Sequence, residues 1–491
     1  MTRVVVVGAG VGGLAAAARL SALGHQVTVC EQAERVGGKL GLLERAGFRF
    51  DTGPSLVTLP QVLRETFAAT GAPLEGVLDL VPVDPLAHYR FADGTTFAAS
   101  ADLDAFAATL DAALHPGAGA DWRRFLARAG AIWSAVRGPF LSAPIGGVTD
   151  LARHSTRLRD MATIAPWRTL RSLGRRYLRD PRLVMFLDRY ATYAGSDPRR
   201  APAALAAIPY AEQAYGGWYV RGGLYRIAQA LAERAGERGA SLRTGADVER
   251  VVLSGGRVAG VRLADGELLP ADVVVANADA AHLYRDLLPG DAAVGPRRRL
   301  ARTTPSLSGF VLLLGLRGTT PRLAHHTVVF PADYDAEFDA LFGAAPAPVP
   351  DPTLYVSAPA DPAVHPAGCE GWFVLVNAPR QGPVDWTAPG VADGYADHLL
   401  QRLAERGLDV RGRLLFREIV TPADLRRRTR AVGGAIYGTS SNGARAAFLR
   451  PANRAPIPGL FLVGGSAHPG GGLPLVLLSA RIVARLVGPA T

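Results

Sequence analysis

The first thirty residues combine two short apolar runs with a stretch of small residues between them. Residues 4–7 are four consecutive valines, a β-branched run typical of a buried parallel strand. Glycines at G-x-G-x-x-G spacing follow, and the alanine-rich stretch after them predicts a helix over about 14–23. Residues 26–30 predict a second buried strand. The pattern therefore predicts a βαβ unit whose first turn is rich in glycine.

Later segments alternate between helical and strand-like patterns. Helices are expected over 103–114, 122–136, 151–193 (broken by Pro166 and Pro181), 224–238 and from 473 onward. Strands or hairpins are expected over 86–97, 248–253, 272–277, 306–316, 323–330, 354–357, 371–377 and 460–463. A chain of 491 residues with this mixture exceeds what one hydrophobic core usually supports, so at least two domains are expected.

Composition narrows the class of protein. The chain is 48% hydrophobic and 20% charged, as in globular proteins. Its two cysteines cannot make a disulfide framework, and the spacing of Cys and His predicts no metal site. The sequence has no recognisable secretory signal and no apolar run near the ~18–20 residues of a spanning helix, which favours a cytoplasmic location.

The net charge of +11 is concentrated in part in one segment. Within 151–193, apolar residues alternate with arginines at helical spacing, as in helices that lie on anionic bilayers. The apolar members are Met161, Ile164, Trp167, Leu170, Leu173 and Tyr177, and the arginines are Arg153, Arg157, Arg159, Arg168, Arg171, Arg175, Arg176, Arg179 and Arg182. We expect peripheral (monotopic) association with an anionic membrane; the alternative is a solvated basic face over an ordinary core. Nucleic-acid binding would rest on net charge alone, and we do not expect it.

The glycines of the first turn have the spacing of a dinucleotide site. Gly8 permits the tight turn, Gly10 allows backbone to approach a pyrophosphate, and Gly13 allows close packing of helix on strand. The helix N-terminus offers free N–H groups to the phosphates. Glu31, at the end of the second strand, is placed to accept hydrogen bonds from ribose hydroxyls.

Two further glycine-rich blocks favour a long cofactor such as FAD. Gly37 and Gly38 form a second tight turn with Arg35 and Lys39 beside it as possible phosphate partners, and an Asp-Thr-Gly-Pro turn follows at 51–54. Near the C-terminus, residues 464–472 (GGSAHPGGG) lead into an apolar helix with Pro474 in its first turn. This uncapped helix start suits the N1–C2=O edge of a reduced, anionic flavin.

These blocks together resemble bacterial carotenoid desaturases of the phytoene desaturase type, within the amine oxidase superfamily of flavoproteins. The resemblance runs almost end to end and rests on FDTGPS at 50–55, GGWYVRGG at 216–223, NAD at 277–279, HHTV at 325–328 and GGSAHPGGGLP at 464–474. DRYATYAGSDPRRAPAAL and GGAIYGTSSNGARAAFLRPANR are similar to one branch, the hydroxycarotenoid 3,4-desaturases, diapo-carotenoid desaturases and terminal-methyl oxidases. Phytoene desaturases themselves more often carry GAGTHPGAG-like residues at the C-terminal block.

The resemblance implies an α/β fold: a Rossmann-like FAD-binding domain of the amine oxidase/phytoene desaturase type, an inserted α+β substrate domain and a helical membrane-associating part. We assign 1–80, 222–300 and 426–491 to the discontinuous FAD-binding domain, 81–221 and 301–425 to the substrate domain, and about 120–200 to the membrane-docking segment. The implied FAD contacts are Gly8, Gly10, Val11, Gly12, Gly13, Glu31, Gln32, Arg35, Gly38, Lys39, Gly53, Pro54, Ser55, Val248, Gly464, Gly465, Gly472, Leu473 and Pro474.

The implied chemistry is removal of hydrogens from adjacent saturated carbons of an acyclic carotenoid, with hydride transfer to flavin N5. One dinucleotide motif is present, so we expect electrons to leave to O2 or a quinone rather than NAD(P). C-3,4 desaturation of a hydroxylated carotenoid is the finer expectation; the alternatives are a phytoene desaturase proper, a terminal-methyl oxidase or another amine oxidase-like enzyme.

No catalytic acid or base can be assigned from the sequence. His468 lies in the flavin-facing loop and is a candidate, with a loop histidine held by backbone hydrogen bonds as the alternative. His325 and His326 are adjacent, so in a strand they are expected to face opposite ways. Trp218, Tyr219 and Trp372 are candidates for an apolar tunnel, although such aromatic residues usually belong to the core.

Overall fold

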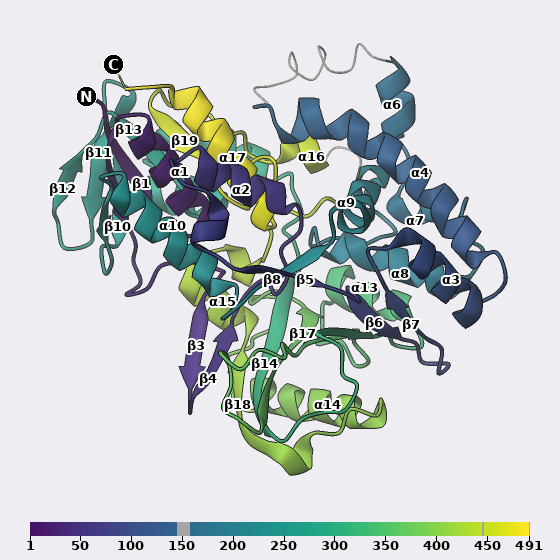
Figure 1. Cartoon of the computed structure of the whole chain (residues 1–491). Helices are drawn as coiled ribbons and strands as arrows, with labels where there is room; N and C mark the ends of the chain where they lie inside the picture. Colours follow the sequence, from purple (N-terminus) through teal and green to yellow (C-terminus); the bar gives the residue numbers. More distant parts are fainter. Residues whose placement is uncertain (145–157, 444–445, 491) are drawn as a thin grey trace.

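The computed structural model describes residues 1–144, 158–443 and 446–490. Three regions are arranged around a common centre (Figure 1): a parallel sheet with its helices, a larger mixed sheet and a group of helices. The part of the predicted 151–193 helix that precedes residue 158, with Arg153 and Arg157, lies outside the described residues, as does the side chain of Arg159.

The parallel sheet contains both strands predicted at the N-terminus. Its order is β19 (Leu460–Leu462), β13 (Val273–Ala276), β1 (Arg3–Val7), β2 (Gln26–Cys30) and β9 (Ser241–Arg243), with every neighbouring pair parallel. Strands from distant parts of the chain therefore meet in one sheet, which is the arrangement of a doubly wound nucleotide-binding fold.

Successive valines of β1 face opposite sides of this sheet, and each side is covered. Val4 and Val6 pack with α1 (Val11–Ala22), α10 (Tyr225–Glu237) and α17 (Leu473–Val487). Val5 and Val7 pack against an antiparallel sheet of β10 (Val248–Ser254), β11 (Arg257–Leu263) and β12 (Leu268–Pro270). Burial on both faces explains the continuous apolar run. Helix α1 begins at residue 11, three residues earlier than predicted.

The mixed sheet has seven strands. Its order is β18 (Leu414–Val420), β14 (Ser308–Arg317), β17 (Cys369–Ala378), β16 (Leu354–Ser357), β15 (His326–Val329), β6 (Ala87–Arg90) and β7 (Thr96–Ala99), and only the β15–β6 pair is parallel within the described residues. The predicted hairpin over 86–97 therefore joins this sheet. The strand-rich interpretation of 300–425 missed helices α13 (Tyr334–Phe342) and α14 (Val391–Glu405).

Residues that alternate along β14 separate the two faces of this sheet. Leu312 and Leu314 face α14 together with Trp372, which is fully buried there, so Trp372 is a core residue. Leu313 and Phe373 face the other way, toward the β3 (Leu42–Arg45) and β4 (Phe48–Asp51) hairpin. The second face therefore packs on β4, the strand that leads into the 51–54 turn.

The helical region packs on the β6–β7 end of the sheet (Figure 1). Its helices are α3 (Leu103–Ala113), α4 (Ala118–Val136), α6 (Leu158–Ile164), α7 (Leu170–Gly174), α8 (Pro181–Thr192) and α9 (Ala207–Tyr215). The remaining elements are α2 (Pro60–Ala68), β5 (Leu80–Val83), β8 (Gly217–Val220), α11 (Ala280–His282), α12 (Val294–Leu300), α15 (Pro422–Thr429) and α16 (Ala446–Leu449).

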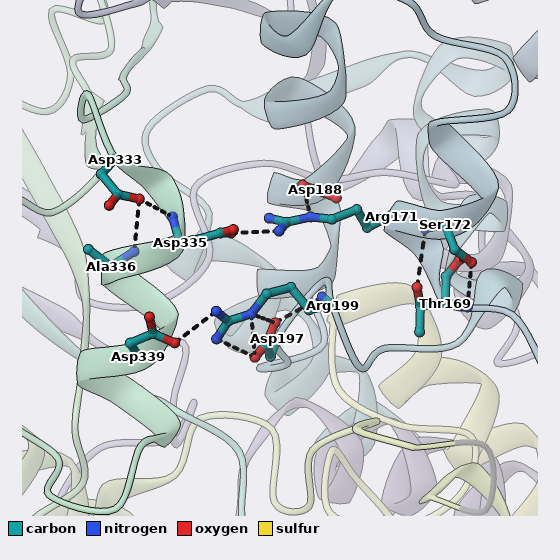
Figure 2. A network of polar contacts seen from close by, with 10 residues as sticks. All are labelled: Thr169, Arg171, Ser172, Asp188, Asp197, Arg199, Asp333, Asp335, Ala336 and Asp339. Atoms are coloured by element: carbon teal, nitrogen blue, oxygen red, sulfur yellow. Dashed lines mark hydrogen bonds and ion pairs between the residues drawn. The ribbon is translucent and has the colours of Figure 1, made fainter.

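Residues 158–182 are interrupted around Pro166 and before Pro181, as expected, but part of the predicted membrane-facing surface lies in the core. The segment forms separate short helices, and Leu170 and Leu173 are 0% and 2% exposed in the core. Figure 2 shows Arg171 of α7 between Asp188 and Asp335, at 2.7 and 2.6 Å, so this arginine stabilises packing of α7, α8 and α13. The alternation of apolar and basic residues arises here because ion pairs border a buried helix face.

Candidate functional site

The first glycine turn (residues 8–13) joins β1 to α1 and has the predicted backbone geometry. Gly8 has φ +97°, a conformation that favours glycine. A Cβ at Gly13 would lie 2.1 Å from the Gly8 carbonyl oxygen, so only glycine permits this contact. Gly10 is the N-cap of α1 without a capping side chain, and Val11 begins the helix. The first N–H groups of α1 are therefore available to an anion.

Asn277, at the end of β13, packs over this turn. A Cβ at Gly10 would lie 2.7 Å from Asn277 Oδ1, and one at Gly464 would lie 2.4 Å from Asn277 Nδ2. The same Nδ2 donates to the Val463 carbonyl at 3.1 Å. Asn277 thus links the first glycine turn to the C-terminal block. The sequence analysis missed this role, although the residue ends a predicted buried strand.

Glu31 is fixed at the end of β2 by backbone donors. Its Oε2 accepts from the Ala9 N–H at 2.7 Å, and its Oε1 accepts from the Ala33 N–H at 3.0 Å. The Ala246 N–H donates to the Glu31 carbonyl at 2.8 Å, which brings the segment leading to Val248 alongside. The carboxylate is therefore held rigidly beside the first glycine turn, as a ribose-binding acid requires.

The second glycine turn (residues 37–38) touches the first. Gly37 and Gly38 have φ +111° and +60°, and the Gly37 N–H donates to the Ala9 carbonyl at 2.8 Å. Position 53 also has no room for a side chain, because a Cβ there would lie 2.1 Å from the Lys39 carbonyl oxygen. The turns at 8–13, 37–38 and 51–54 thus form one continuous backbone surface.

The predicted phosphate partners and Gln32 have other bonds in this structure. Lys39 Nζ donates to the carbonyls of Ala435 and Ile436 at 3.0 and 2.5 Å, and burial lowers its pKa. Arg35 pairs with Glu44 and its side chain is 61% exposed. Gln32 donates to the Arg428 carbonyl at 2.9 Å. Lys39 therefore fixes the 435–436 segment beside the second turn, whereas Arg35 points outward.

The C-terminal glycine loop (residues 464–472) leads into α17. Gly464 and Gly472 have φ +108° and +106°, and Gly472 is an N-cap without a capping side chain. Leu473 and Pro474 form the first turn of the helix, where the missing N–H of proline removes no intrahelical bond. A Cβ at Gly12 would lie 2.9 Å from Val476 Cγ1 of α17. The two uncapped helix starts, α1 and α17, are therefore neighbours.

Buried polar side chains hold this loop in place. Ser479 Oγ of α17 donates to the His468 carbonyl at 2.8 Å and accepts from the Gly464 N–H at 3.2 Å. Asn453 Nδ2 donates to the same His468 carbonyl at 2.8 Å. Arg450 donates to the carbonyls of Tyr437 and Gly465, at 2.9 and 2.8 Å. None of these three side chains was identified from the sequence, because their partners are backbone groups of loops that have no periodic pattern.

His468 has the geometry of a positioning residue. Its Nε2 lies 2.8 Å from the Phe140 carbonyl oxygen and 3.1 Å from that of Ala143, so Nε2 carries the proton and donates. Burial lowers its pKa to about 4. The neutral ring thus ties the C-terminal glycine loop to residues 140–143.

Beside the glycine turns at 8–13, 37–38, 51–54 and 464–472 (the cofactor turns) lies a hydrogen-bonded pair formed by Ser55 and Tyr355 of β16. Ser55 Oγ and Tyr355 Oη are 2.5 Å apart, and the same hydroxyl lies 2.8 Å from His326 Nδ1. Pro54 and Ser55, both predicted contacts, are partly exposed at this point. The expected opposite orientation of His325 and His326 is wrong: their ring centroids are 4.4 Å apart. His325 precedes β15, so the alternation of strand side chains does not apply to it.

Comparison with known proteins agrees with this geometry. Residues 11–341 match the model of the flavin containing amine oxidoreductase family. The 4,4'-diapolycopene oxygenase of Methylomonas sp. is 34% identical, covering 98% of this chain and 97% of its own. The 1-hydroxycarotenoid 3,4-desaturase of Flavobacterium sp. (strain P99-3) is 33% identical, covering 99% of both. A crystal structure of an oxidoreductase from Methanosarcina mazei shares the fold, with TM-score 0.65, 18% identity and coverage of 98% and 100%.

The chain therefore belongs to the flavin-containing amine oxidoreductase family, in the group of FAD-dependent carotenoid desaturases. The uncapped starts of α1 and α17, with the glycine surface between them, fit an extended, anionic cofactor, and FAD is the cofactor of this family. Among the described residues, no helix is long and apolar enough to cross a membrane, and no cluster of His, Cys, Asp and Glu could hold a metal ion.

Proposed function

We propose that this protein desaturates an acyclic carotenoid, removing hydrogens from adjacent saturated carbons and so lengthening the conjugated polyene. The finer proposal is C-3,4 desaturation of a hydroxylated acyclic carotenoid. FAD would be held by the predicted contacts at the glycine turns, Glu31 and the start of α17. When bound, FAD supplies the two-electron acceptor for the hydride.

This proposal rests on a group of apolar and aromatic side chains near the cofactor turns. Tyr193, Tyr355, Leu375, Ile436 and Tyr437 all retain accessible surface. Burial nevertheless raises the pKa of Tyr355 and Tyr437 to about 12. Enclosed side chains that keep accessible surface are those expected around an internal space. We infer that these five apolar and aromatic side chains border the polyene, which requires such surroundings.

The buried carboxylates of this region argue against a small cationic substrate such as an amine. Glu212 accepts a hydrogen bond from Tyr190 Oη at 2.6 Å. Glu337 accepts from the Thr353 N–H at 2.8 Å and from Asn377 Nδ2 at 2.7 Å. Both carboxylates accept hydrogen bonds from neutral donors, Glu337 through both oxygens and Glu212 through one.

The residues of this chain contribute to the reaction mainly by position and by exclusion of water. A cation that develops beside a polyene is delocalised over the conjugated chain, so the protein must hold the reacting carbons against the cofactor and keep the site dry. Ser55 and Tyr355 connect the 51–54 turn to the mixed sheet. His468 fixes the C-terminal glycine loop and does not take up the proton at Nε2, which already donates two hydrogen bonds.

Peripheral association with an anionic membrane is part of the proposal, because the substrate has no water-soluble form. It is supported by Trp167, which is 68% exposed, and by the exposed residues Arg175 and Arg176. An exposed tryptophan next to arginines is typical of an interfacial contact. Reoxidation by O2 or a quinone completes the proposal.

Product analysis tests this function and separates its alternatives. Purified protein in anionic liposomes is given phytoene, lycopene or a 1-hydroxy acyclic carotenoid, in air or without O2 but with a quinone. Loss of paired hydrogens with a longer chromophore supports desaturation, and conversion of phytoene as the preferred substrate would contradict the C-3,4 assignment. O2-dependent gain of oxygen would instead indicate a terminal-methyl oxidase. No product from any polyene would refute the carotenoid proposal.

A further inference from the structure

Arg189 of α8 is a buried cation without an acidic partner. Its residue exposure is 7%, and its Nε has no hydrogen-bond partner. Within the described residues its guanidinium forms no ion pair, whereas Arg171 on the neighbouring α7 pairs with Asp188 and Arg182 at the start of the same helix pairs with Asp180. Burying an unpaired charge is costly, so a ligand for this guanidinium is to be expected.

The guanidinium lies over two of the tyrosines that we propose to border the polyene. Its carbon is 5.4 Å from the ring centroid of Tyr355 and 5.8 Å from that of Tyr193. Tyr355 in turn bonds Ser55 of the 51–55 turn. On the other side, Tyr437 packs on the C-terminal glycine loop, since a Cβ at Gly471 would lie 2.6 Å from its ring.

Glu212 and Glu337 are buried carboxylates that lie close enough to Arg189 for electrostatic attraction. Both are already hydrogen-bonded to neutral groups, as described above. The two carboxylates stabilise the positive charge of Arg189 through space. They accept no hydrogen bond from its N–H groups. An apolar polyene hydrocarbon cannot supply an acceptor, whereas an oxygen at the end of the polyene can.

We propose that Arg189 is a specificity-determining residue that donates hydrogen bonds to an acceptor oxygen at the end of the polyene nearest the cofactor. This inference rests on the proposed function. In a 1-hydroxy carotenoid the oxygen is separated from C-3 and C-4 by only a few bonds. An arginine separated from Ser55 only by the Tyr355 side chain is therefore well placed to hold that oxygen while the adjacent carbons react.

The test is substrate discrimination in Arg189→Met, with Arg182→Met as the matched control on the same helix. The two substrates are a 1-hydroxy acyclic carotenoid and the acyclic hydrocarbon of equal chain length, and the quantity is the ratio of their kcat/KM values. Loss of a charged hydrogen bond should reduce this ratio by about 10- to 100-fold in Arg189→Met, with partial rescue in Arg189→Lys. Arg182→Met should keep the wild-type ratio.

An equal fall in kcat/KM for both substrates would overturn the assignment, because a merely structural arginine would not change the ratio. If Arg189→Met fails to fold, binding to the wild-type protein tests the inference instead. Titration followed by tryptophan fluorescence should give a lower Kd for the hydroxylated polyene than for the hydrocarbon. Equal Kd values would refute the inference. Wild-type protein that converts neither polyene would refute the proposed function itself, so the two failures are distinguishable.

Discussion

Gly13→Ala provides a sharp test of the geometry around the cofactor turns. The new Cβ would lie 2.1 Å from the Gly8 carbonyl oxygen, more than 1 Å inside ordinary contact distance, and 3.0 Å from Asn277 Oδ1. Alanine in place of helical glycine gains about 0.5–1 kcal/mol of helix stability. Overpacking of this kind costs about 1–3 kcal/mol or more. Because α1 is packed against α10 and α17, we expect a net loss of stability and a distorted turn.

Gly236→Ala is the matched control, since Gly236 lies in α10 and no heavy atom is within 4 Å of its added Cβ. It should gain about 0.5–1 kcal/mol and bind FAD as wild type does. For Gly13→Ala we expect a lower Tm and about a tenfold or greater rise in the FAD Kd, equivalent to about 1.4 kcal/mol. Thermal unfolding and quenching of flavin fluorescence measure the two quantities. Gly13→Ala protein with wild-type Tm and Kd would refute the reasoning.

Three further changes test other parts of the structure. The pKa of His468 is lowered to about 4 in the folded state, so its contribution to stability is present above pH 6.5 and is lost as pH falls toward 4. His468→Gln should flatten the fall in Tm between pH 6.5 and 4.5, and an unchanged pH profile would contradict this. Ser479→Ala leaves the Gly464 N–H without its bond and should lower stability by about 1–3 kcal/mol in denaturant unfolding; no change in midpoint would argue against this role. Trp167→Ala should weaken sedimentation with anionic liposomes severalfold; equal binding would count against membrane contact through this residue.

Local elements and the cofactor motif could be predicted from the sequence because their signals are local. The valine run of β1 and the glycine spacing after it require only neighbouring residues. The buried strand over 272–277 was likewise recognised and lies beside β1 as β13. The helix start at Pro474 followed from a single proline in the first turn.

Residues that act across long sequence distances could not be found in this way. Asn277 holds the C-terminal glycine loop through a partner 186 residues away, whereas Arg450 and Ser479 hold it through backbone carbonyls whose positions no sequence pattern reveals. Arg189 lies in the DRYATYAGSDPRRAPAAL segment and was given no role from the sequence, and only the absence of an acidic partner distinguishes it from the buried Arg171. Periodicity cannot separate a membrane-facing residue from a core residue bordered by ion pairs, which explains why Leu170 and Leu173 were wrongly placed on the membrane-facing surface.

The central claim, that an acyclic carotenoid is the electron donor to the bound flavin, is tested most directly by anaerobic single turnover. FAD-loaded protein in liposomes is mixed with a partly saturated acyclic carotenoid in the absence of any acceptor, and flavin absorbance and product mass are followed together. We predict bleaching of the flavin with loss of two hydrogens from the carotenoid in equal amounts. An oxidised flavin that persists with every polyene, but is bleached by a primary amine, would contradict the account.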